Sequence, residues 1–131
     1  MASSTRRCTP ATRAGRLAKA GQFFLAAETI ETTIDDHGVA DAYAPLCVHA
    51  GIAAADAICC ARLGEHALGD DHQAAVALLA KADRAAAKHL KVLLDLKTRS
   101  GYSAIPTSKA DQKRAGRAAA ALLTAAQAAA G

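Results

Sequence analysis

The sequence predicts an all-α protein, an antiparallel four-helix bundle with one additional short helix. Three observations predict it. Alanine dominates the apolar half of the 131-residue chain, and alanine has the highest intrinsic helix propensity. Apolar residues recur at helical spacing through four long segments. Short loops join these segments, which is typical of antiparallel bundles. No strand pattern and no internal repeat are evident.

The first two long helices are predicted from their apolar residues and the glycines that follow them. The helix 11–36 is expected from Leu17, Phe24 and Ile30, and Gly38 would end it in a left-handed cap. The helix 41–63 follows, with a core stripe that includes Leu46, His49, Ile52, Asp56 and Leu63. Residues 1–11 are small, polar and basic, so a disordered arm is expected there. Residues 12–130 are expected to form one helical domain.

Capping residues predict where the remaining helices begin. A serine or aspartate side chain accepts a hydrogen bond from a first-turn backbone N–H that otherwise lacks a partner. The expected caps are Asp70 or Asp71 for the helix 72–81, Asp83 for 83–100 and Ser108, in a capping box with Asp111, for 109–129.

An alanine-rich core is thin, which bears on stability and assembly. Alanine buries little area, so a monomer of this composition is expected to be marginally stable. Leu25 is counted among the larger core residues, and Gly51 and Gly116 would let helix axes approach closely. Burial of a further face against a second copy would add stability, so a homodimer is expected.

Charge is divided along the chain. The segment from Glu28 to Ala80 contains nine acidic residues and one basic residue. The segment from Lys81 to Arg117 contains ten basic residues and three acidic residues. Such asymmetry indicates either a surface for a polyanion or acidic and basic helices that pair with each other.

The cysteines and the apolar segments limit the protein class. Cys8, Cys47, Cys59 and Cys60 form no C-x-x-C motif, so they are expected to be reduced and mostly buried thiols. No secretory signal and no membrane span are predicted. A cytoplasmic protein without a membrane role is therefore expected. The histidines at 66 and 72 lie near acids but fit no standard metal-ligand spacing, so neither a metal nor another cofactor is expected.

Three segments resemble helices of the HEPN (higher eukaryote and prokaryote nucleotide-binding) superfamily. Residues 48–65 resemble the second helix of that family, with the sequence VHAGIAAADAICCARLGE. Two further segments resemble the last two helices of that family. They are residues 87–104, AKHLKVLLDLKTRSGYSA, and residues 106–124, PTSKADQKRAGRAAAALLT. In that family a long helix ends in an Arg- or Tyr-containing turn before a Ser- or Thr-capped helix. Arg99, Tyr102 and Ser108 hold those places here.

The resemblance covers about residues 12–128 and implies a small, commonly dimeric bundle. Some members are metal-independent endoribonucleases with an Arg-x4–6-His motif. Others lack it and bind a protein, RNA or a nucleotide, often beside a nucleotidyltransferase. Arg84 and His89 match Arg-x4-His, and such a pair could move a proton and stabilise phosphorane charge. However, they lie well before the expected turn and about 140° apart on one helix, so they are weak catalytic candidates.

Two groups of residues are candidates for ligand or anion binding. Asp56 lies in an apolar stretch, where a carboxylate needs a partner, and Lys97 or Arg99 is the expected partner. This pair is either a structural ion pair or the border of a small pocket. The second group is a basic row that suits phosphates, with Tyr102 near it as a base-stacking residue; the row consists of Lys109, Lys113 and Arg117.

The resulting expectation is a non-catalytic, HEPN-like, dimeric binding module for a protein partner, such as a nucleotidyltransferase, or for RNA or a nucleotide. A toxin–antitoxin or defence system is the expected setting. One alternative is a HEPN endoribonuclease toxin that uses Arg84 and His89. The other is a structural bundle without a ligand.

Overall fold

The computed structural model describes residues 4–33, 40–102 and 104–131, without the side chains of residues 33 and 98–102. These residues are mostly helical, which confirms the all-α class. Predicted and observed helix bounds agree within two residues, except for the end of the first helix, which was expected at residue 36 and lies outside the described residues. The helices are α1 (Pro10–Thr33), α2 (Ala40–Leu63), α3 (His72–Ala82), α4 (Arg84–Tyr102) and α5 (Lys109–Ala130).

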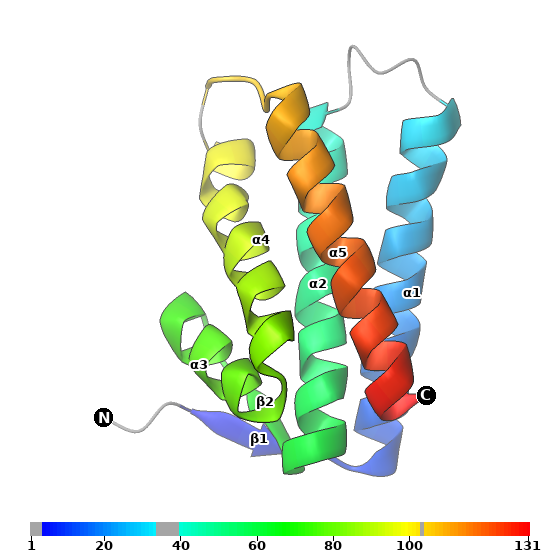
Figure 1. Ribbon diagram of the computed structural model, residues 1–131, viewed down its shortest axis with the longest axis vertical. Coiled ribbons are helices and arrows are strands. Elements are labelled where there is room, and N and C mark those ends of the chain that lie inside the picture. Colours follow the sequence, from blue (N-terminus) through cyan, green and yellow to red (C-terminus); the bar gives the residue numbers. More distant parts are fainter. Residues whose placement is uncertain (1–3, 34–39, 103) are drawn as a thin grey trace.

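The four long helices lie side by side and alternate in direction (Figure 1). α2 lies at the centre, where it contacts α1, α4 and α5. α5 packs across α2 between α1 and α4, and the short α3 lies beside the first turns of α4 (Figure 1). Every long helix therefore contributes to one continuous core.

The centre of this core is built mainly from small residues of α2. Among the described helices α2 is long and apolar enough to cross a membrane by length and composition, and it is mostly buried inside the protein. The central helix of a folded domain passes the same test. Its larger buried partners come from the neighbouring helices and include Leu79, Leu90, Leu93, Leu96 and Leu122.

Side-chain caps begin the last three helices, as predicted. Asp71 accepts from the backbone N–H of Ala74 (3.0 Å) at the start of α3. Asp83 accepts from Ala86 N–H (3.0 Å) at the start of α4. Ser108 accepts from Asp111 N–H (3.1 Å) at the start of α5.

Two glycines allow the close helix contacts expected from the sequence. A Cβ atom added at Gly51 of α2 would overlap the side chain of Leu93 in α4. A Cβ atom added at Gly116 of α5 would overlap the hydroxyl of Tyr43 in α2. Both neighbours are buried, so these glycines fix how closely α2 approaches α4 and α5.

The N-terminal segment differs from the prediction. Within residues 1–11, expected to be disordered, the strand β1 (Thr5–Arg7) pairs antiparallel with β2 (Glu65–Ala67), and α1 already begins at Pro10. Neither strand was predicted. Two further backbone hydrogen bonds extend the pairing, from Cys8 N–H to the Gly64 carbonyl (2.9 Å) and from Leu68 N–H to the Ser4 carbonyl (3.0 Å).

The prediction of reduced thiols is wrong for two cysteines. Cys8 and Cys60 form a disulfide that joins the segment after β1 to the end of α2. Cys47 and Cys59 are free and buried, as expected for small apolar residues. Burial raises the pKa of Cys47 to about 11 and that of Cys59 to about 12, so both stay protonated at neutral pH.

Two residues assigned to the core lie at the surface. Leu25 of α1 is 65% exposed. His49 of α2 is also exposed, and its ring stacks on Phe23 of α1 with the centroids 5.2 Å apart. Both residues fit the helical period, but the period does not tell which side of a helix a neighbour covers.

Candidate functional site

The predicted basic row is present on α5. Lys109, Lys113 and Arg117 are all exposed, and their spacing of four residues places them along one side of the helix. The Ser108 cap fixes the beginning of α5 just before the row. The three side chains therefore form a line of positive charge about two helical turns long.

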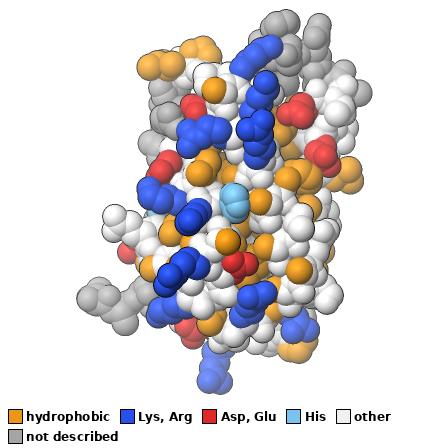
Figure 2. All heavy atoms as spheres, in the orientation of Figure 1, with side chains coloured by type: hydrophobic (Ala, Val, Ile, Leu, Met, Phe, Trp, Pro, Cys, Tyr) orange, Lys and Arg blue, Asp and Glu red, His pale blue; other side chains and the backbone are white. Residues whose placement is uncertain are grey.

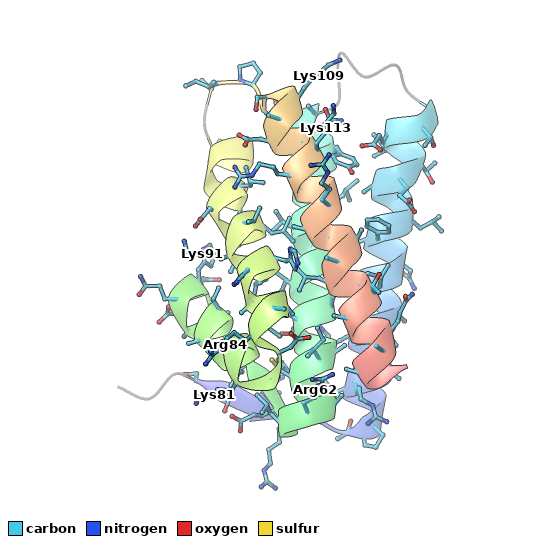
Figure 3. All side chains as sticks on the ribbon, in the orientation of Figure 1. Arg62, Lys81, Arg84, Lys91, Lys109 and Lys113 are labelled. Carbon is cyan, nitrogen blue, oxygen red and sulfur yellow. A yellow bond between two sulfur atoms is a disulfide. The ribbon has the colours of Figure 1, made fainter. Side chains whose placement is uncertain are left out.

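Further basic residues of α4 extend this charge. Arg84, Lys88 and Lys91 are exposed at intervals of four and three residues. Figure 2 shows Lys and Arg side chains gathered over α3, α4 and the upper part of α5. Figure 3 places Lys109 and Lys113 at the start of α5 and Arg84 and Lys91 along α4. We call the following six residues the basic face: Arg84, Lys88, Lys91, Lys109, Lys113 and Arg117.

The acids of α4 and α5 neutralise little of this face. Asp95 pairs with Lys91 at 3.2 Å, and Asp111 pairs with Arg114, outside the face, at 3.3 Å. Within the described part of the chain, no carboxylate pairs with four of the other five cations, Arg84, Lys88, Lys113 and Arg117. Most of the face is thus available to a negatively charged partner.

The two weak catalytic candidates do not converge in one copy of the chain. Arg84 is the exposed first residue of α4, and His89 is half-buried five residues later on the same uninterrupted helix. This separation directs the side chains about 140° apart. No hydrogen bond joins them among the described residues, so the arrangement needed for joint acid–base chemistry is lacking within a monomer.

Asp56 has a partner that was not predicted. Its Oδ2 atom accepts from Arg16 of α1, at 3.0 Å from Nε and 2.9 Å from Nη2. The Nδ1 atom of His66 in β2 lies 3.9 Å from the same oxygen. The expected pairing with Lys97 is wrong, since Lys97 forms no ion pair with Asp56. Arg99 belongs to α4, and its side chain, like that of Tyr102, lies outside the described residues.

Asp56 is nearly enclosed, and this affects its ionisation. Its side chain is 14% exposed, against 28% for Arg16 and 12% for His66. Burial raises the pKa of Asp56, and the nearby Arg16 and His66 partly oppose the rise. The ion pair therefore offsets only part of the cost of burying this carboxylate.

A cavity of about 210 Å³ lies beside Asp56. Its apolar wall comes from Ile52 and Ala55 of α2 and from Leu90 and Leu94 of α4. Asp56 and Lys97 both line it, so the structure brings together two of the predicted ligand-binding residues even though they do not pair. Its outer wall is the segment between β2 and α3, and the polar residues there are Asp70, Asp71 and His72.

Arg16 and His66 were not proposed as site residues from the sequence. Arg16 is one of several bases in the N-terminal part of the chain, and nothing in its spacing points to Asp56. His66 stands near Glu65 and Asp70, a pattern that suggests metal binding rather than a contact with Asp56. Among the described residues, no three His, Cys, Asp or Glu side chains converge as metal ligands.

Comparisons with protein-family models, with curated proteins and with solved structures give no match. Any function proposed for this chain therefore rests on its own residues.

Proposed function

We propose that this chain is a non-catalytic, HEPN-like antiparallel four-helix bundle that acts as a homodimer and binds RNA through the basic face. The observation that carries the proposal is the set of exposed, unpaired cations on neighbouring helices. Arg84 and Lys88 supply it on α4, and Lys113 and Arg117 supply it on α5. Exposed cations on a common surface attract phosphates and release counterions when they bind.

The proposed binding does not depend on base sequence. Phosphate contacts position a nucleic acid without reading its bases. Single-strand binders with stacking platforms use exposed aromatic side chains. The aromatic side chains described here lie elsewhere, because Phe23 and Phe24 belong to α1 and Tyr43 is buried. A backbone-directed contact is thus the mode that the described residues support.

The proposal is tested by measuring RNA affinity against salt concentration. A short, labelled single-stranded RNA is titrated with wild type and with Lys113→Ala/Arg117→Ala between about 50 and 200 mM salt. Each lost phosphate contact removes about 0.7 from the slope of log K against log salt for a single strand. The double variant is expected to lose about 1.4 and to bind more weakly at every salt concentration.

The matched control is Arg13→Ala/Lys19→Ala. It removes the same charge from exposed positions of α1, which lies on the opposite side of α5 from α4 (Figure 1). An equal loss in both variants would mean that net charge, not the basic face, determines binding, and would refute the proposal. Cleavage of the RNA by wild type but not by Arg84→Ala or His89→Ala would favour the endoribonuclease instead.

A further inference from the structure

The cavity beside Asp56 is unrelated to the proposed RNA contact, because none of the six basic-face residues lines it. It lies between α2 and α4, and the segment that leads into α3 lines its outer side. We infer that it binds a small organic ammonium ion with an apolar body. The inference rests on three features, namely the charge of the lining, one carboxylate oxygen without a partner, and the apolar wall.

The charged groups of the lining favour a cation. Asp56, Asp70 and Asp71 are opposed in the lining by Lys97 alone. Arg16 lies outside the lining and neutralises Asp56 through Oδ2. In a formal count that leaves out the histidines, the lining and this outer arginine together carry one excess negative charge. A neutral or anionic ligand would leave that charge unbalanced.

One oxygen is placed to accept from such a ligand. The hydrogen bond from Arg16 Nε and the close Nη2 contact both reach Oδ2 of Asp56, and no described residue donates to Oδ1. Asp71 uses its Oδ1 to cap α3, whereas Asp70 is an exposed residue of the lining with which no described residue pairs. An ammonium group that binds Oδ1 of Asp56 would form a charge-assisted hydrogen bond beside the apolar wall.

The apolar wall determines the chemical character of the part of the ligand that does not carry the ammonium group. Ile52, Ala55, Leu90 and Leu94 can contact only a hydrocarbon surface favourably. A cavity of about 150 Å³ accepts benzene, so the 210 Å³ here fits roughly eight non-hydrogen atoms. A benzyl or branched alkyl group with one ammonium matches both the size and the charge.

The outer wall is held before any ligand binds. β2 is paired with β1 immediately before it, and the Leu68 N–H donates to the Ser4 carbonyl (3.0 Å). Gly69 turns the chain with φ of +83°, a conformation that favours glycine. The Asp71 cap then begins α3. A wall fixed at both ends lowers the ordering cost of binding.

The test compares aromatic probes of similar size by titration calorimetry on the full chain at neutral pH. The probes are benzylamine, benzyl alcohol and benzoate. Benzylamine is expected to bind at least about tenfold more tightly than benzyl alcohol, because both can donate a hydrogen bond to Asp56 but only the ammonium group also pairs with its charge. Equal binding of amine and alcohol, tighter binding of benzoate, or no binding of benzylamine would overturn the inference.

Three variants of lining residues test whether benzylamine binds in this cavity. Asp56→Asn is expected to weaken benzylamine binding about tenfold, and Ala75→Leu, at a half-buried lining position, is expected to abolish it by filling the space. Because Asp56→Asn leaves Arg16 without its partner, Asp70→Asn serves as a second charge variant. Asp70 is exposed and pairs with no described residue, so this variant is expected to fold and to bind benzylamine several-fold more weakly. The control Glu28→Gln removes a charge from α1 and is expected to bind as wild type does. Benzylamine affinity unchanged in all three lining variants would overturn the inference.

Two further probes, a linear alkylamine and a zwitterionic amino acid, distinguish a simple amine from an amino acid as the source of the ammonium group. Tighter binding of the amino acid would mean that Lys97 contacts its carboxylate, and tighter binding of the simple amine that it does not. The simple amine is expected to bind more tightly, because a zwitterion has no net charge to balance the excess, and tighter binding of the amino acid would overturn the charge argument. Failure of the RNA experiment would not affect this one, because the two use different residues and different probes.

Discussion

Replacement of Gly51 by alanine tests the contact between α2 and α4. Two effects oppose each other. Alanine is favoured over glycine in a helix interior by about 1 kcal/mol. The new Cβ, however, would overlap Leu93 and lie close to Leu122, both fully buried. Added volume in a packed core costs about 1–3 kcal/mol, so Gly51→Ala is expected to be neutral or destabilising by up to about 2 kcal/mol.

The matched variant is Gly21→Ala in the middle of α1. A Cβ at Gly21 meets nothing within 4 Å, so this variant should gain the helix-propensity term alone. The propensity term is common to both variants and cancels in their difference. Gly51→Ala should therefore be less stable than Gly21→Ala by about 1–3 kcal/mol. For a chain of this length that corresponds to roughly 4–11 °C in Tm.

Thermal unfolding followed by circular dichroism measures this difference. Gly116→Ala serves as a second case, since its Cβ would overlap the buried Tyr43 hydroxyl. If Gly51→Ala raised the Tm as much as Gly21→Ala does, Leu93 would not pack against Gly51. The account of close approach between α2 and α4 would then be wrong.

Three other variants test caps, crosslinks and charge. Cys8→Ser is expected to lower the free energy of unfolding by up to about 4 kcal/mol, the loop-entropy value for a sequence separation of 52 residues. A reductant should lower the urea midpoint of wild type and leave the urea midpoint of Cys8→Ser unchanged. Asp71→Ala should cost about 1 kcal/mol by removing the α3 cap, seen as a lower Tm. Because the folded pKa of Asp56 is raised above 3.8, its ionisation opposes folding, so Asp56→Asn should gain stability relative to wild type as pH rises from about 3.8. A pH-independent difference in thermal stability would contradict this.

The helices were predictable because their signals are local. Periodic apolar residues show that a helix forms, and side chains such as Asp71, Asp83 and Ser108 mark where it begins. β1 and β2 were not predictable in this way. Each strand has three residues, and their paired positions, such as Thr5 and Ala67, are far apart in the sequence. Local alternation cannot reveal a pairing this short and distant.

The site was predictable in its residue types but not in its pairings. An aspartate in an apolar stretch correctly pointed to a buried carboxylate with a basic partner, and to a nearby pocket. The partner was expected on the basic helix that carries Lys97, yet Arg16 of α1 fills that role. Helical periodicity fixes which residues share a side of α2, but tertiary packing decides which neighbour covers that side. The same reason explains why His49 is exposed.

The crosslink between Cys8 and Cys60 changes how the molecule would respond to mechanical force. A pull applied near residue 4 is carried through the sulfur atoms directly to the end of α2, so α1 and most of α2 bear no load. In a single-molecule extension, the oxidised protein should release a contour length shorter by roughly 17–19 nm, because the chain between Cys8 and Cys60, a sequence separation of 52, stays hidden inside the covalent loop. Reduction of the crosslink should restore that length.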